Sequence, residues 1–286
     1  MSKKRKSKKK QQRATVEWVI LMLFISGVGY IMNLYGCSGL SLQTNDTPRY
    51  EGATLTTHID DLYMARTAKG CPSQIIRHTG FTLSYNNNLR LANWVGYELT
   101  AQETDGNIER SDWFDIDPKV RGTKVRHADY THSGFDRGHM APAADMKWDE
   151  KAMEESFYMS NICPQVHALN AGAWNSLENR VRSWAKRDSA VIVVCGPIVD
   201  SQPMTIGNNR VAVPTHFYKI IASPYTDNPR GIAFIMPNEA IDNPLYTYAV
   251  TIDSVERATG IDFLYNLPDS LENYIEQNID PISWQL

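Results

Sequence analysis

Residues 133–140, with the sequence SGFDRGHM, place a carboxylate (Asp136), a guanidinium (Arg137) and an imidazole (His139) within four positions. The stretch also holds two glycines, which allow tight turns and leave room for another group to approach closely. Together the three side chains suit a site that holds a phosphate and moves a proton. The alternative is a polar turn whose histidine is only hydrogen-bonded.

A second polar group follows about thirty residues later. An apolar stripe at steps of three and four residues predicts a helix over residues 170–186. At about 100° per residue, Asn170, Glu178 and Arg182 fall within roughly one third of the helix circumference. An amide, a carboxylate and a guanidinium are therefore expected to project toward one cleft.

The remaining chain predicts an α+β domain. Apolar and alternating runs predict strands, and Thr251 to Ala258 read as a strand end, a cap and the start of a helix. Residues 101–132 are polar and irregular, which is typical of a long functional loop. We expect a central, mainly antiparallel sheet flanked by helices. The expected strands cover 75–78, 81–86, 91–100, 191–195, 211–213, 217–221 and 231–236, and a further helix covers 149–158.

The N-terminus predicts a membrane segment. Residues 1–13 carry eight Lys/Arg and no acidic residue, and residues 18–35 are uncharged and largely apolar. This pattern indicates a membrane-inserting helix whose basic flank stays in the cytoplasm. The predicted organisation is a basic cytoplasmic tail (1–16), a transmembrane anchor or signal (17–36), a linker (37–74) and a catalytic domain (75–286).

Other interpretations of this N-terminus stay open. The basic run alone is also typical of a nucleic-acid arm or a nuclear-localisation patch. The sequence Leu34-Tyr35-Gly36-Cys37 is similar to a lipoprotein cleavage box, which would leave a lipid on Cys37. An uncleaved anchor is favoured because Tyr35 is bulky for such a box and the apolar run is long for a signal peptide. Location in a bacterial periplasm or at a cell surface is then expected.

Charge and cysteine content exclude some classes of protein. Without the eight basic residues of the tail, the 29 Lys/Arg fall to 21 against 32 Asp/Glu, a formal charge of −11. This argues against a broad basic nucleic-acid-wrapping face but permits a local basic cleft. Cys71, Cys163 and Cys195 are widely spaced and form neither a disulfide framework nor a zinc pattern.

The motifs resemble one family. Asp136-Arg137-Gly138-His139, followed by SNICPQ at 160–165, Asn170 and Leu177-Glu178, resembles the DNA/RNA non-specific endonucleases, a family that includes secreted Serratia-type nucleases and mitochondrial endonuclease G. The resemblance covers roughly residues 75–270. It extends to residues 93–95, 195–197 and 211–217.

The resemblance implies a ββα-metal fold with one divalent ion, usually Mg²⁺, with Mn²⁺ or another divalent ion as alternatives. In that pattern His139 matches the general base that takes a proton from the attacking water. Asn170 matches the side chain that binds the ion directly, and an amide oxygen suits Mg²⁺. Glu178 matches the carboxylate that orients metal-bound water.

The resemblance also assigns the arginines. Arg137 and Arg182 match groups that neutralise the phosphate in the transition state. Arg110, in the polar loop, is the candidate for the family's remaining catalytic arginine, and Asp136 is expected to orient its neighbours. For substrate binding the candidates are Asn161 and Gln165, whose alternative role is to brace a loop.

The leading hypothesis is a membrane-tethered, exported endonuclease that cleaves DNA and RNA and contacts the membrane through its N-terminal helix. A homodimer is an assembly to be tested. One alternative is a catalytically silent nucleic-acid-binding surface module on the same fold. Others are a different phosphodiesterase or phosphatase, and a mitochondrial nuclease of the endonuclease G type.

Overall fold

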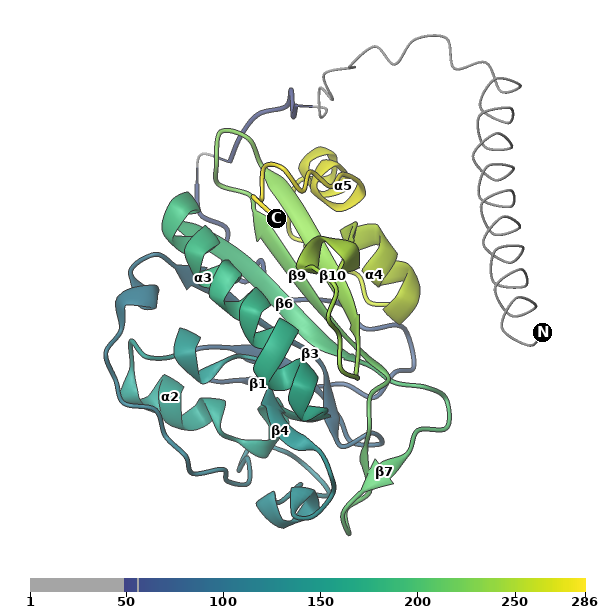
Figure 1. Ribbon diagram of the computed structural model, residues 1–286. Helices are drawn as coiled ribbons and strands as arrows, with labels where there is room; N and C mark the ends of the chain where they lie inside the picture. Colours follow the sequence, from purple (N-terminus) through teal and green to yellow (C-terminus); the bar gives the residue numbers. More distant parts are fainter. Residues whose placement is uncertain (1–48, 56) are drawn as a thin grey trace, which may run out of the picture. The chain divides into compact units, whose positions relative to one another are not determined.

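The structure, a computed structural model that describes residues 49–55 and 57–286, is built on a seven-stranded sheet (Figure 1). Every neighbouring pair of strands in the sheet is antiparallel, which confirms the predicted central antiparallel sheet. In spatial order the strands are β1 (Gln74–Arg77), β2 (Thr82–Asn86), β3 (Leu91–Thr100), β6 (Ala190–Ile198), β9 (His216–Ser223), β10 (Arg230–Pro237) and β11 (Ala249–Val250).

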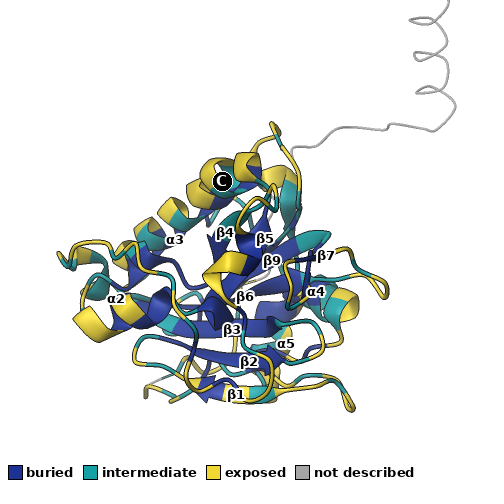
Figure 2. Cartoon of the chain, turned by 90° about the horizontal axis from the view of Figure 1, so that it is seen from below, coloured by how far each residue is buried: buried dark blue, intermediate teal, exposed yellow. Residues whose placement is uncertain are grey.

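Helices cover both faces of this sheet (Figure 1): α3 (Asn175–Asp188) on one face, α4 (Ile252–Thr259) and α5 (Asp269–Gln277) on the other. Successive side chains of a strand point to opposite faces. On β6, Val193 accordingly joins the apolar core under α3, whereas Ile192 and Val194 join the core under α4 and α5. Figure 2 shows the central strands buried and the outer helix faces exposed.

The sheet connections hold the shorter elements. Asp149 begins α2 (Glu150–Ser156) by accepting a hydrogen bond from the backbone of Ala152 at 2.9 Å, as expected for an N-cap. Five of the remaining short elements are 3₁₀ helices: η1 (Glu103–Asp105), η2 (His127–Tyr130), η3 (Ala143–Asp145), η4 (Met159–Asn161) and η6 (Leu245–Tyr248). One, η5 (Leu169–Trp174), is a π-helix. Two further strand pairs are β4 (Asp136–His139) with β5 (Ile162–Gln165) and β7 (Thr205–Ile206) with β8 (Val211–Ala212).

The Asp-Arg-Gly-His stretch is strand β4 rather than a turn, and it pairs antiparallel with β5. The two glycines serve different purposes. Gly134 has a φ of 84°, a backbone conformation that glycine adopts without strain. Gly138 lies inside the strand, where a Cβ atom would clash with the side chain of Gln165. After β5 the chain continues through η5 into α3.

The helix predicted over 170–186 is broken. Residues 169–174 form the π-helix η5, Gly172 has non-helical angles (φ −99°, ψ −108°), and α3 begins only at Asn175. The regular spacing that placed Asn170 on one face with Glu178 and Arg182 therefore does not hold across Gly172. From Asn175 onward the prediction is confirmed, because Leu177, Val181 and Trp184 are buried.

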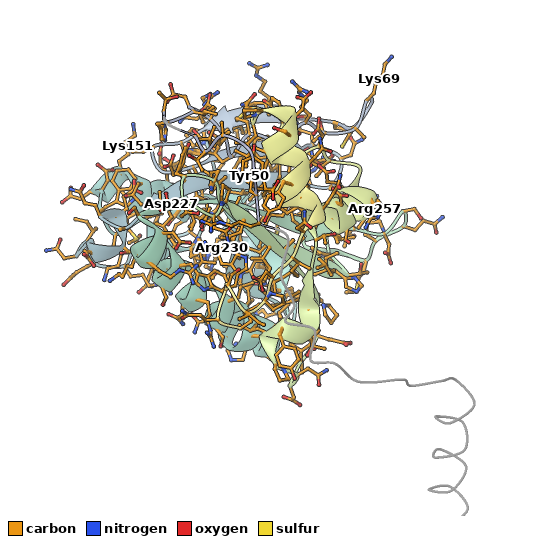
Figure 3. The ribbon with its side chains drawn as sticks, turned by 90° about the horizontal axis from the view of Figure 1, so that it is seen from above. Tyr50, Lys69, Lys151, Asp227, Arg230 and Arg257 are labelled. Atoms are coloured by element: carbon orange, nitrogen blue, oxygen red, sulfur yellow. The ribbon has the colours of Figure 1, made fainter. Side chains whose placement is uncertain are left out.

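The C-terminal part of the predicted linker at 37–74 packs into the folded domain instead of lying outside it. Leu62 and Ala65 are buried in the core under α4 and α5, and the backbone of Arg66 pairs with Asp262. Tyr50, labelled in Figure 3, contacts Tyr274 of α5 with ring centroids 5.1 Å apart. The apolar residues of this segment are few and lie scattered among polar residues. They therefore show no periodicity from which their packing could be predicted.

The predicted cytoplasmic tail and membrane segment at 1–36, with Cys37, lie outside the described residues. Across 49–55 and 57–286, no helix combines the length and apolar character needed to span a bilayer.

Candidate active site

His139, the last residue of β4, lies among aromatic rings. Its ring meets Phe157 edge-on, with centroids 4.7 Å apart, and lies 5.5 Å from Phe114. The residue is only 9% exposed, and its Nε2 atom is buried without a hydrogen-bond partner. Burial, together with the positive charge of Arg110, lowers the pKa of His139 to about 3. The imidazole is therefore neutral near pH 7, which is the form that has a nitrogen lone pair available.

This burial predicts an acid-sensitive fold. A histidine whose pKa is lower in the folded protein than in the unfolded chain binds a proton more readily after unfolding. Its contribution to the unfolding free energy is therefore fully present above about pH 6.5 and decreases as the pH falls toward 3. Between pH 7.5 and pH 5, we expect the unfolding free energy of wild type to fall by about 2 kcal/mol more than that of His139→Asn. Denaturant unfolding of both proteins at the two pH values measures this; parallel losses would contradict it.

Asp136 holds the side chain of Asn170. One carboxylate oxygen, Oδ2, accepts a hydrogen bond from Asn170 Nδ2 at 2.9 Å and lies 2.8 Å from His167 Nδ1. Because Nδ2 is engaged, the amide oxygen Oδ1 of Asn170 is left to bind something else. Mg²⁺ prefers oxygen ligands and retains several waters. These residues thus fit the divalent ion that the resemblance implies, and the hydrogen bond to Asp136 restricts the side chain of Asn170.

Glu178, in the first turn of α3, is half-buried. Burial raises its pKa to about 7; the charges of Lys219, Arg182 and Arg110 oppose this rise, and that of Asp145 adds to it. Arg110 acts electrostatically on Glu178 and His139 alike, and its guanidinium lies over Phe157 at 5.1 Å from the ring centroid. The arginine predicted from the polar loop thus lies near both predicted catalytic groups.

Arg137 is held close to the same aromatic group. Its Nη2 donates to the backbone oxygen of His127 at 3.2 Å, and its guanidinium lies 5.7 Å from the ring centroid of Phe114. The Nε atom is buried without a partner, and burial lowers the pKa of Arg137. A bound phosphate would pair with this charge and partly offset its desolvation.

Arg182 is engaged in an ion pair. Its Nη1 donates to the buried Asp145 at 2.6 Å, and Asp145 also accepts a hydrogen bond from Tyr97 at 2.7 Å. The side chain of Arg182 is 17% exposed and that of Asp145 only 1%. The structure therefore gives this arginine a structural partner in addition to the phosphate-binding role predicted from the sequence.

Loss of this ion pair is expected to destabilise the fold. Arg182→Met would leave the Asp145 carboxylate buried with only Tyr97 as a side-chain partner, which costs about 3–5 kcal/mol of unfolding free energy. Arg182→Lys retains the charge and should lose less. Chemical denaturation of the three proteins measures the difference. Unchanged stability in Arg182→Met would show that the pair contributes nothing to folding.

Comparison with known proteins identifies the family of this chain. The sequence pattern of the family described as DNA/RNA non-specific endonuclease matches residues 63–270, which include the whole site. The chain belongs to this family. Membership identifies it as an endonuclease, an enzyme that hydrolyses phosphodiester bonds; metal dependence is a property of the family.

Individual relatives cover a similar part of the chain. Mitochondrial endonuclease G of Bos taurus is 37% identical over 210 residues, 68% of this chain and 70% of the relative. Nuclease C1 of Cunninghamella echinulata is 40% identical over 215 residues, 69% of this chain and 85% of the relative. A crystal structure of an EndoG/EndoGI complex matches with a TM-score of 0.65 and 35% identity, covering 69% of this chain and 89% of that one.

For this endonuclease the two predicted substrate-binding amides need correction. Asn161 is fully buried, and its side chain makes hydrogen bonds to the backbone of Ala141 (2.9 Å, both as donor and acceptor) and Ser156 (2.8 Å). Gln165 is also fully buried, behind Gly138. Neither side chain is accessible to a polymer substrate, so Asn161 braces the loop after β4 and Gln165 packs against the strand.

Lys219 was not predicted as part of the endonuclease site. It lies on β9, is 1% exposed, and its Nζ is 4.5 Å from the ring centroid of Trp174. Its charge favours the ionised form of Glu178. The available signal was a single lysine within the apolar strand sequence at 216–223, because an unpaired lysine is rarely buried.

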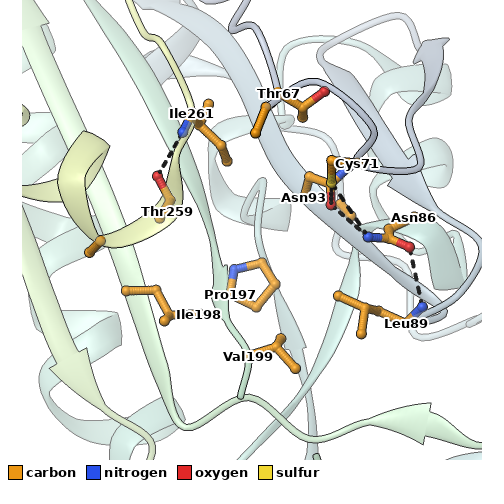
Figure 4. Close-up of a pocket in the computed structure, with 13 residues that line it drawn as sticks. Thr67, Cys71, Asn86, Leu89, Asn93, Pro197, Ile198, Val199, Thr259 and Ile261 are labelled. Atoms are coloured by element: carbon orange, nitrogen blue, oxygen red, sulfur yellow. Dashed lines mark hydrogen bonds between the residues drawn. The ribbon is translucent and has the colours of Figure 1, made fainter. Parts of the chain in front are cut away.

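A cavity of about 180 Å³ lies elsewhere in the endonuclease, between β3, β6 and the end of α4 (Figure 4). Asn93 lines this cavity. Its amide nitrogen donates to the backbone oxygen of Pro72 at 2.8 Å, and its amide oxygen accepts a hydrogen bond from Asn86 at 3.0 Å. None of the predicted catalytic residues lines the cavity. Asn93, part of the sequence resemblance, thus has a structural role.

Proposed function

We propose that this endonuclease cleaves both DNA and RNA, with little sequence preference, in a reaction that depends on a divalent ion. The main support for this proposal is His139. Its imidazole is neutral and buried, its Nε2 has no hydrogen-bond partner, and the positive charge of Arg110 acts on it. Phosphate contacts by arginine carry no sequence information, and they predict that cleavage weakens as salt concentration rises.

In the proposed reaction, His139 accepts a proton from the attacking water as the water oxygen bonds to phosphorus and the bond to the 3′-oxygen breaks. Arg137 and Arg110 stabilise the charge that builds on the phosphate oxygens. Asp136 accepts a hydrogen bond from Nδ2 of Asn170, which leaves the amide oxygen of Asn170 available for the ion. Mg²⁺, bound through that oxygen, would act as a Lewis acid toward the phosphate and the leaving oxygen. The leaving 3′-oxygen takes a proton from solvent water, so the products carry a 5′-phosphate and a 3′-hydroxyl.

The ion is proposed as Mg²⁺, with Mn²⁺ as a substitute. Glu178 is proposed to orient water on the ion, a role for which an ionised carboxylate is needed. Lys219 supports this role because its charge favours the ionised form of that carboxylate. A catalytically silent binding module is the alternative, and activity measurements separate the two.

Location and assembly are separate proposals. The basic and apolar sequence of residues 1–36 supports tethering to a membrane with the catalytic domain on the far side. The alternative is a mitochondrial location, which the names of the relatives from Bos taurus and Saccharomyces cerevisiae state for those proteins. Fractionation with protease protection distinguishes the sites, and light scattering tests for a homodimer.

The test of the activity incubates the full-length chain with supercoiled plasmid and with single-stranded RNA, in Mg²⁺ or in EDTA. We expect Mg²⁺-dependent breakdown of both polymers and 5′-phosphate ends that a phosphatase removes. Cleavage of only a small phosphodiester would favour a different phosphodiesterase. No cleavage by a folded protein in Mg²⁺ or Mn²⁺ would refute the nuclease mechanism and leave the binding module.

A further inference from the structure

Three carboxylates meet where α4 packs against α5, on the face of the sheet opposite α3. Asp253 and Glu256 come from α4, and Glu276 comes from the last turn of α5. One oxygen of each lies within 4.8 Å of the others. These helices lie side by side in Figure 1, and they contribute to the core that excludes α3. The cluster is therefore separate from the candidate active site.

Glu276 is the unusual member of this cluster. The residue is 7% exposed, and its Oε1 is buried without a hydrogen-bond partner. It also lies at the C-terminal end of α5, where the helix dipole disfavours a negative charge, and no basic residue occupies that last turn. A buried carboxylate normally has a cation or hydrogen-bond donors around it.

The protein supplies little of that compensation among the described residues. Asp253 has only a 3.9 Å ion pair with Arg257, whose side chain is 68% exposed. Glu256 accepts one hydrogen bond, from the backbone nitrogen of Phe263 at 2.9 Å. Neither interaction reaches Glu276, so the converging oxygens still lack a positive partner.

The spacing fits a calcium-sized ion. Ca²⁺ binds oxygen ligands at about 2.3–2.6 Å, so two ligands on opposite sides of the ion are at most about 4.6–5.2 Å apart. For Mg²⁺, with bonds of about 2.0–2.1 Å, that limit is about 4.2 Å. The three carboxylate oxygens lie within 4.8 Å of one another, which is compatible with the calcium range.

We propose that Asp253, Glu256 and Glu276 form a second divalent-cation site, of a size that Ca²⁺ fits, that joins α4 to α5. Water completes the coordination on the exposed side, where Asp253 lies. The ion has a structural role: it stabilises the layer of helices on the face of the sheet away from His139, and it takes no part in phosphodiester cleavage.

The experiment uses the full-length chain after removal of metals, with calcium chloride as the probe. Calorimetric titration gives the number of sites, and thermal unfolding gives the stabilisation. With calcium about 100-fold above its Kd, we expect the Tm to rise by about 5–10 °C. Glu276→Gln, which keeps the size of the side chain, should abolish the rise, and Asp253→Asn should reduce it.

Two matched variants control for other binding sites. Glu272→Gln removes a neighbouring carboxylate of α5 outside the cluster, and Asn170→Ala removes the proposed ligand of the active-site ion; both should retain the calcium-dependent rise. The proposal is overturned if Glu276→Gln keeps the rise, if Asn170→Ala alone loses it, or if wild type binds no calcium at the cluster. These readouts do not depend on nuclease activity, so the two proposals can fail separately.

Discussion

Replacing His139 with alanine is expected to lower the rate of plasmid cleavage by about 10²- to 10⁴-fold, the usual contribution of a general base. The rest of the site would still bind the polymer, so KM should change much less than kcat. The physical basis is the neutral imidazole, which no described protein group engages by a hydrogen bond. Steady-state cleavage of a labelled oligonucleotide measures both constants.

The His139 prediction needs a readout that separates chemistry from folding, because the ring also packs against Phe157. Added imidazole should partly restore cleavage in His139→Ala, since a free base can enter the vacated space. His58→Ala, which removes a half-exposed histidine, serves as the matched control and should retain wild-type rates. Full activity in His139→Ala would eliminate this residue as the base.

Replacing Asn170 with alanine is expected to abolish cleavage at millimolar Mg²⁺ and to raise the Mg²⁺ concentration needed for half-maximal activity by at least about 10- to 100-fold. That range is the usual effect of losing even an outer partner of a metal ligand. The amide oxygen is the proposed ligand, and alanine offers no substitute for it. Titration of cleavage rate against Mg²⁺ measures the shift.

Asp136→Asn tests the orientation of that ligand directly. Asn170 is still present in this variant, but the acceptor that fixes its Nδ2 becomes an amide that can turn either way. We expect the Mg²⁺ concentration needed for half-maximal activity to rise by about 10-fold relative to wild type. If Asn170→Ala and Asp136→Asn both keep the wild-type Mg²⁺ dependence, another group binds the ion.

The sequence predicted those parts of the fold that depend on local periodicity. The apolar run of β6 and the stripe of α3 are both buried as expected, because their patterns determine which faces are buried. The break at Gly172 escaped prediction, since a glycine within a helical pattern permits a kink without requiring one.

The site was predicted where a motif placed several side chains together in sequence, as in β4. Tertiary packing decided the rest. Asn161 and Gln165 carry the same amide chemistry as Asn170, and only burial distinguishes a bracing amide from an accessible one. Lys219 reaches the site from β9, a strand far along the chain, so no local spacing connected it with Glu178.

The contact between Gly138 and Gln165 limits how this site can change over time. A side chain at position 138 would displace the neighbouring strand unless position 165 became smaller at the same time. Because His139 follows directly, such a displacement would also move the proposed base. The two positions are thus coupled: position 138 can gain a side chain only if position 165 becomes smaller before that change or together with it.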